Sequence, residues 1–131
     1  MGAGTAIIAS DSPAGAPNVA RVAALATTNA NNIKPTAGAV YGFFFASKLA
    51  AATARYVKFY DKAAAPVVGT DTPLFTVPVV ATTGQVGEAE LEISMGIPFK
   101  NGIAYAITGA IADSDTTVCA ADDVHGFILW K

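Results

Sequence analysis

The sequence predicts an all-β protein, an antiparallel β-sandwich that could take the form of a jelly roll, with an extended N-terminal arm. Seven or eight short runs of apolar, β-branched and aromatic residues are separated by linkers rich in Gly, Pro, Asn and Asp. No stretch of useful length has the apolar spacing of an amphipathic helix. Short strands without intervening helices favour two packed sheets, and a small closed barrel is the alternative.

The strongest strand signal lies at residues 54–61. Because side chains alternate between the faces of a strand, one face would carry Arg55, Val57 and Phe59 and the other Tyr56, Lys58 and Tyr60. We expect Val57 and Phe59 in the core. The opposite face combines two aromatic rings with a cationic stem, which suits a second layer or a partner chain better than water. Tyr56 and Tyr60 are therefore candidate interface residues.

Residues 1–18 are rich in Gly, Ala, Ser and Pro and contain no run that could close a core. They are either a tail without fixed structure or an extended arm that a neighbouring subunit orders. In the second case Ile7 and Ile8 are the anchors and join the candidate interface residues. The β-sandwich domain would then comprise residues 19–131, with a first strand within 19–28.

Residues 39–46 are apolar on both faces, which is typical of a central strand covered on both sides. Residues 48–54 have helical propensity but are too few for a stable helix, so we expect a connector with one helical turn. The aromatic runs at 39–46 and 54–61 would then be neighbours in one sheet.

Two strands in the second half carry edge signals. Pro78 cannot donate to a ladder, so the strand at 74–80 is placed at an edge or carries a bulge. Residues 88–95 alternate, with Glu88, Glu90 and Glu92 outward and Ala89, Leu91, Ile93 and Met95 inward. Three carboxylates on one strand face repel each other unless they are solvated, and an acid/base pair would instead face its partner across a cleft. We read the glutamates as a solvated face that opposes edge-to-edge pairing.

Asn101-Gly102 predicts a two-residue hairpin that leads into a strand at 103–108. The chain closes on a last strand at 124–131.

Four carboxylates gather between these two strands, namely Asp113, Asp115, Asp122 and Asp123. Alternating aspartates suggest calcium, but the glycine and the terminal glutamate of an EF-hand loop are absent. The sequence leaves open whether this region binds a cation, and no metal ligand or cofactor is assigned.

The chain offers little for catalysis. His125 is the only histidine, and no serine or cysteine lies in a recognisable nucleophile motif, so no catalytic residue is assigned and an enzyme is the weakest interpretation. Cys119 is the only cysteine and cannot form an internal disulfide, which indicates a reducing compartment.

Composition favours a protein that buries surface against copies of itself or against a larger assembly. The chain of 131 residues is 53% hydrophobic and only 14% charged, so few charges are available to cover the surface. The net charge of −2 and the scattered Lys and Arg argue against a nucleic-acid partner. The N-terminus lacks the features of a signal peptide, and no apolar run is long enough for a membrane span.

Several segments carry a resemblance, namely residues 39–44, 55–63, 65–73, 102–109 and 112–117. In their order they resemble small structural proteins of tailed bacteriophages. The matching stretch runs from about residue 39 to 117 and excludes the N-terminal arm. The motifs are structural rather than catalytic.

The resemblance implies a virion component, made in the host cytoplasm and located on the capsid surface. A decoration or cement protein that binds the major capsid protein fits best, and the resemblance implies a homotrimer. A tail, baseplate or fibre module is the competitor among virion proteins. A carbohydrate-binding adhesin domain that uses exposed Tyr and Trp as stacking platforms is the alternative from another class.

Overall fold

The computed structural model describes residues 15–47, 53–81 and 87–131, and these residues form strands and loops without a helix. The strands are β1 (Asn18–Ala23), β2 (Asn31–Lys34), β3 (Gly38–Ser47), β4 (Thr53–Asp61), β5 (Phe75–Ala81), β6 (Gly87–Phe99), β7 (Ile103–Thr108) and β8 (Val124–Trp130). The all-β prediction is confirmed. Within this part of the chain no helix is long and apolar enough to cross a membrane.

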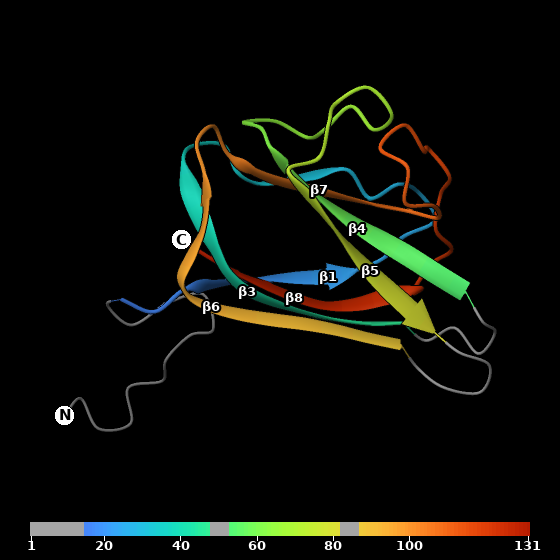
Figure 1. The fold of residues 1–131 in the computed structure, drawn as a ribbon, viewed down its shortest axis with the longest axis horizontal. Helices are drawn as coiled ribbons and strands as arrows, with labels where there is room; N and C mark the ends of the chain where they lie inside the picture. Colours follow the sequence, from blue (N-terminus) through green and yellow to red (C-terminus); the bar gives the residue numbers. More distant parts are fainter. Residues whose placement is uncertain (1–14, 48–52, 82–86) are drawn as a thin grey trace.

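The strands form two four-stranded antiparallel sheets that pack face to face (Figure 1). The first sheet has the order β1-β8-β3-β6 and the second the order β2-β7-β4-β5. The predicted β-sandwich is therefore confirmed.

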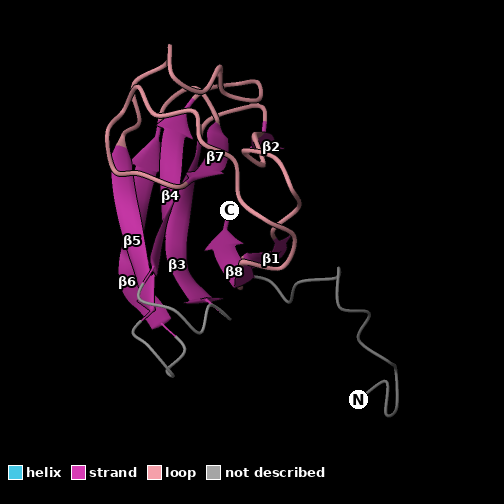
Figure 2. Ribbon diagram, turned by 90° about the vertical axis from the view of Figure 1, so that its right-hand side faces the viewer, coloured by secondary structure: helices cyan, strands magenta, loops and turns pink. Residues whose placement is uncertain are grey.

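The pairing is nested from the ends of the chain inward. β1 pairs with β8, β2 with β7, β3 with β6 and β4 with β5. Only β4 and β5 are both consecutive and in one sheet, so every other connection crosses between the two layers seen in Figure 2. The pairs β3–β8 and β4–β7 then join these ribbons side by side.

The core lies between the sheets and is centred on aromatic rings. Phe59 has 0% exposure, and its ring centroid lies 4.7 Å from that of Phe75 and 5.8 Å from that of Phe43. Val57 is also fully buried and lies with Phe59 in the main core cluster, whereas Tyr60 lies in a separate cluster. The predicted strand phase and core are therefore confirmed.

The aromatic runs at 39–46 and 54–61 are not sheet neighbours, and that prediction is wrong. β3 lies in the first sheet and β4 in the second, so Phe43 and Phe45 meet Phe59 across the core. Periodicity assigns a residue to a face of its strand, but it does not say which sheet the strand joins.

β5 and β6 are both edge strands. Pro78 lies exposed on β5, as predicted for an edge. The three glutamates of β6 point outward as predicted, and Ala89 and Ile93 are half-buried. The inward placement of Met95 is wrong, because it is 89% exposed. Leu91 lies opposite the core residue Phe43 on the inner face, but it is 41% exposed.

A bulge in β6 explains the exposure of Met95. The register passes from Gly42 opposite Glu92 to Val40 opposite Ile97, so four residues of β6 oppose Tyr41 alone. Gly96 has φ +78° within this bulge. Strict alternation ends there.

Asn101-Gly102 does not close a hairpin, because β6 and β7 lie in different sheets. The backbone amide of Asn101 donates to the Asp61 carboxylate at 2.7 Å. A Cβ on Gly102 would lie 2.5 Å from the Lys62 carbonyl oxygen and 2.6 Å from that of Lys34. Glycine is needed at this crossing for a close backbone approach rather than for a hairpin turn.

Two predicted segments lie mostly outside the described residues. The connector at 48–54 is described only from residue 53, where β4 begins. The N-terminal arm is described only from Gly15, and β1 starts at Asn18. β1 ends at Ala23, earlier than the expected strand, and the turn that follows contains Asn29 at φ 55°.

Candidate interaction surface

The structure removes Tyr60 from the candidate interface. Its side chain is 1% exposed and packs with Ala104 and Ala106 of β7, with Val68 of the 62–74 loop against this cluster. The outer face of β4 is thus covered by this chain rather than by a partner. Tyr56 is half-buried on the same face, opposite Pro78 and Thr108. Ile7 and Ile8 lie outside the described residues.

Lys58 anchors the loop after β7 to β4. Its side chain is fully buried, and its Nζ donates to the Ala112 carbonyl oxygen at 2.6 Å. Burial lowers the pKa of Lys58, and the nearby Asp115 and Asp113 carboxylates act in the opposite direction. The Tyr60 pKa is raised by burial and by Asp113 and Asp71. Among the described residues the Tyr60 hydroxyl has no hydrogen-bond partner.

Three of the four aspartates between β7 and β8, namely Asp115, Asp122 and Asp123, have different partners. Asp115 accepts hydrogen bonds from the Thr117 hydroxyl at 2.5 Å and from the Ala110 amide at 3.1 Å, and these bonds lower its pKa against the opposing effect of burial. Asp122 lies 2.8 Å from His125 Nε2. In the described part of the chain no three His, Cys, Asp or Glu side chains form a group that could hold a metal ion.

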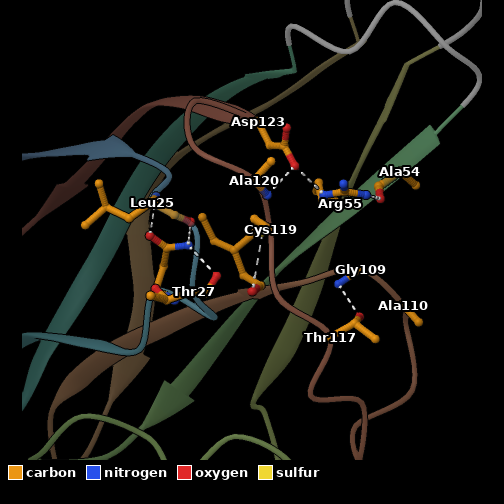
Figure 3. Close-up of polar contacts among 12 residues, drawn as sticks. Leu25, Thr27, Ala54, Arg55, Gly109, Ala110, Thr117, Cys119, Ala120 and Asp123 are labelled. Atoms are coloured by element: carbon orange, nitrogen blue, oxygen red, sulfur yellow. Dashed lines mark hydrogen bonds and ion pairs between the residues drawn. The ribbon is translucent and has the colours of Figure 1, made fainter.

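Asp123 fixes the start of β8 to β4 (Figure 3). Its carboxylate accepts from Arg55 Nε at 2.9 Å and from the Ala120 amide at 2.8 Å, and its side chain is only 2% exposed. The neighbouring Cys119 is buried, and its Sγ lies 3.6 Å from the Ile107 carbonyl oxygen. Burial raises the pKa of Cys119 to about 11, so the thiol stays protonated at neutral pH.

The strand register assembles a charge pattern on the outer face of the first sheet. One row across it runs from Glu90 on β6 through Phe44 on β3 and Phe127 on β8 to Arg21 on β1. The next row towards the bulge holds Glu92, Gly42, Leu129 and Val19, and the row on the other side holds Glu88, Ala46, His125 and Ala23. Carboxylates therefore occupy one edge, apolar residues and His125 occupy the centre, and a guanidinium lies on the opposite edge.

The centre of this face is hollowed. A groove of about 480 Å³ is lined by Phe44, Phe127 and Leu129 together with Glu90 and Glu92. The Phe44 and Phe127 ring centroids lie 6.1 Å apart, and Phe127 is 38% exposed. Small residues at Gly42 and Ala46 leave space around the rings. A second groove of about 550 Å³ shares Glu92 and Leu129 and reaches Tyr41 and Pro17.

Sequence reasoning found the parts of this surface but not the whole. The double-sided apolarity of 39–46 indicated that both faces of β3 would be covered, and the glutamate row was recognised. No other described element covers the outer face of β3, where Phe44 is only half-buried. Arg21 and Phe127 were missed because strand pairing across the sheet, which alternation does not reveal, brings them into one row.

Comparison with family models, with characterised proteins and with solved structures gives no match. Inferences about function therefore depend on these surfaces and on the sequence resemblance.

Proposed function

We propose that this chain is a non-enzymatic virion structural protein, a capsid decoration or cement protein that binds the major capsid protein and stabilises the phage head shell. The observation that carries the proposal is the apolar outer face of the first sheet, which the described part of the chain leaves uncovered. Exposed patches of this kind mark surfaces that bind another protein. The resemblance of residues 39–117 to phage structural proteins supplies the class of assembly.

The strand order supports a jelly roll. Eight strands paired 1–8, 2–7, 3–6 and 4–5 correspond to one long ribbon folded over into two four-stranded sheets. A double-sheet jelly roll has eight strands in two Greek keys and is used in viral capsid and lectin domains. The fold fits a virion role, but fold alone does not specify function.

The polar side chains that were considered for catalysis serve structure instead. The Cys119 thiol is buried and its pKa is about 11, which removes the usual thiolate nucleophile. His125 lies on an exposed strand face beside Asp122, whereas Cys119 lies in the core. We infer that the chain has no catalytic role, and we expect His125→Ala to leave particle assembly intact.

The carbohydrate-binding alternative has less support. Stacking on a sugar needs an exposed flat ring, whereas Trp130 packs against the core and Tyr60 is buried. A tail, baseplate or fibre module uses the same kind of exposed surface and is separated only by its place in the particle.

The decisive experiment is a reconstruction of purified particles, together with binding of the isolated protein to shells that lack it. We expect density for the sandwich on the shell surface and saturable binding to shells. Density confined to the tail would replace the decoration role with a tail role. Absence of the chain from particles, or hydrolase activity that is lost in His125→Ala, would contradict the proposal. The same reconstruction shows whether the copies are arranged as the predicted trimer.

A further inference from the structure

The outer face of the first sheet carries opposite charges at its two edges. Its β6 edge carries Glu88, Glu90 and Glu92, and its β1 edge carries Arg21. All four side chains are exposed, and none forms an ion pair with another residue that the structure describes. Lys131, at one end of the face, lies with its Nζ 5.1 Å from the centroid of the Tyr41 ring.

We propose that a second copy of this chain covers this face through a two-fold axis that runs along the strands, between β8 and β3. Such a rotation exchanges the two edges of the sheet and keeps each row at its own height. Arg21 of one copy then faces Glu90 of the partner subunit, and Phe127 faces Phe44 of the partner subunit. The same contacts occur twice, as an isologous interface requires.

Three observations favour a second copy over another occupant. The row Glu90, Phe44, Phe127, Arg21 becomes its own complement when its order is reversed, so both the charges and the rings find partners. β3 is apolar on both faces although only its inner face is covered. Aligned packing of sheet on sheet is also the geometry that this sandwich already uses within one chain.

The area of this face determines how tightly we expect the two copies to bind. Four strands about 4.8 Å apart and about six residues long give the face a flat area of roughly 400 Å², and protruding side chains add to this area. Specific interfaces bury roughly 800 Å² per partner, so the flat area of this face is only about half of that. We therefore expect a reversible dimer rather than an obligate one. Its ion pairs lie near solvent, so added salt weakens it.

The inference rests on the predicted association of this chain with copies of itself but not on a virion role. A two-fold contact can also occur within a larger closed assembly that contains a three-fold axis.

A charge-exchange experiment tests the pairing. Arg21→Glu places a new carboxylate against Glu90 of the partner subunit at both symmetric contacts, and Glu90→Arg places a new guanidinium against Arg21 of the partner subunit at both. We expect each variant alone to dimerise at least about tenfold more weakly than the natural chain in sedimentation equilibrium, since attraction at both pairs becomes repulsion. In a heterodimer of the two variants, both symmetric contacts again join a carboxylate with a guanidinium. An equimolar mixture therefore removes the repulsion, and we expect it to regain most of the natural affinity.

Lys100→Glu is the matched control, because it makes the same charge change at an exposed position in the turn between β6 and β7. It should dimerise like the natural chain. Circular dichroism and melting curves establish that all three variants are folded. The two-fold pairing is supported if dimer affinity is restored only in the mixture of Arg21→Glu and Glu90→Arg. If the natural chain is monomeric at every concentration, self-association and this pairing both fail. If the natural chain associates but Arg21→Glu does so equally well, self-association stands and this face is not the contact.

Discussion

At the scale of single residues, the fold depends on a few aromatic side chains in contact across the two sheets. Phe59 is the central member, with ring centroids of Phe43, Phe45, Phe75 and Phe99 within 4.7 to 6.4 Å. These partners come from both layers of the sandwich. Loss of this one ring would therefore loosen the contact between the sheets rather than a local surface.

We predict that Phe59→Ala lowers the free energy of unfolding by about 3–5 kcal/mol, because it removes a fully buried ring and leaves a cavity. Phe127→Ala is the control, since its ring lies on the outer face and is 38% exposed. Urea unfolding at low protein concentration, where monomers dominate, measures both. A loss below about 1 kcal/mol for Phe59→Ala would mean that the core can refill the site.

Cys119 provides a prediction about pH. The folded thiol holds its proton up to a pKa of about 11, whereas an unfolded cysteine titrates near about 8.5. Its contribution to stability is therefore complete below about pH 8.5 and is lost as the pH rises towards 11. We expect a thiol reagent at pH 8 to label the protein only after denaturant is added. In Cys119→Val the part of the alkaline loss of stability that belongs to this thiol should disappear. Rapid labelling of the native protein would show that the thiol is not enclosed.

At the scale of elements, the sequence contained the strands but not their partners. Alternation and turn residues locate β3, β4, β5 and β7 within a few residues, because the pattern of a half-buried strand is local. The assignment of β3 and β4 to different sheets depends on where distant strands pair. Asn101-Gly102 shows the same limit, since a dipeptide typical of hairpins here serves a crossing between sheets.

Lys58 shows why part of the candidate site could not be predicted from the sequence. Lys58 alternates with two core residues, so its place on the outer face of β4 is predictable. Its burial is not, because the cover comes from a loop more than fifty positions further on, through the Ala112 carbonyl oxygen. The expected partner chain over Tyr60 was thus replaced by this chain's own loops.

We predict that Lys58→Met lowers the free energy of unfolding by about 1–2 kcal/mol, since it keeps most of the side-chain volume but leaves the Ala112 carbonyl without this donor. The loop that Lys58 holds should be destabilised more than the fold as a whole. Amide hydrogen exchange should rise in residues 109–117 and stay unchanged in β1 and β8. Lys34→Met, a half-buried lysine on β2 away from this loop, is the control. Equal protection of the loop in both variants would show that Lys58 does not hold it.

At the scale of the whole molecule, the nested pairing makes the first and last strands depend on each other. β1 runs antiparallel to β8 from Asn18 opposite Trp130 to Ala23 opposite His125. β8 in turn lies between β1 and β3. A cut on the N-terminal side of Asn18 therefore spares every strand pairing, whereas a cut after Ala23 exposes an edge of β8 and uncovers the buried Ile128.

We predict that deletion of residues 1–14 leaves the melting temperature nearly unchanged and weakens attachment to the shell. Ile7 and Ile8 are the only bulky apolar pair in that segment. Burial of both against a neighbouring subunit would contribute roughly 3–6 kcal/mol before the cost of ordering the segment. Ile7→Ser combined with Ile8→Ser should reproduce most of the lost affinity in the full-length chain, which separates the two side chains from the length of the segment. Deletion of residues 1–23 is the opposite control, because it removes β1 with the buried Val22 and should destabilise the fold itself. Shell binding by the 1–14 deletion that equals binding by the full chain would mean that the segment is not a docking arm, and attachment would then have to come from the surface of the sandwich.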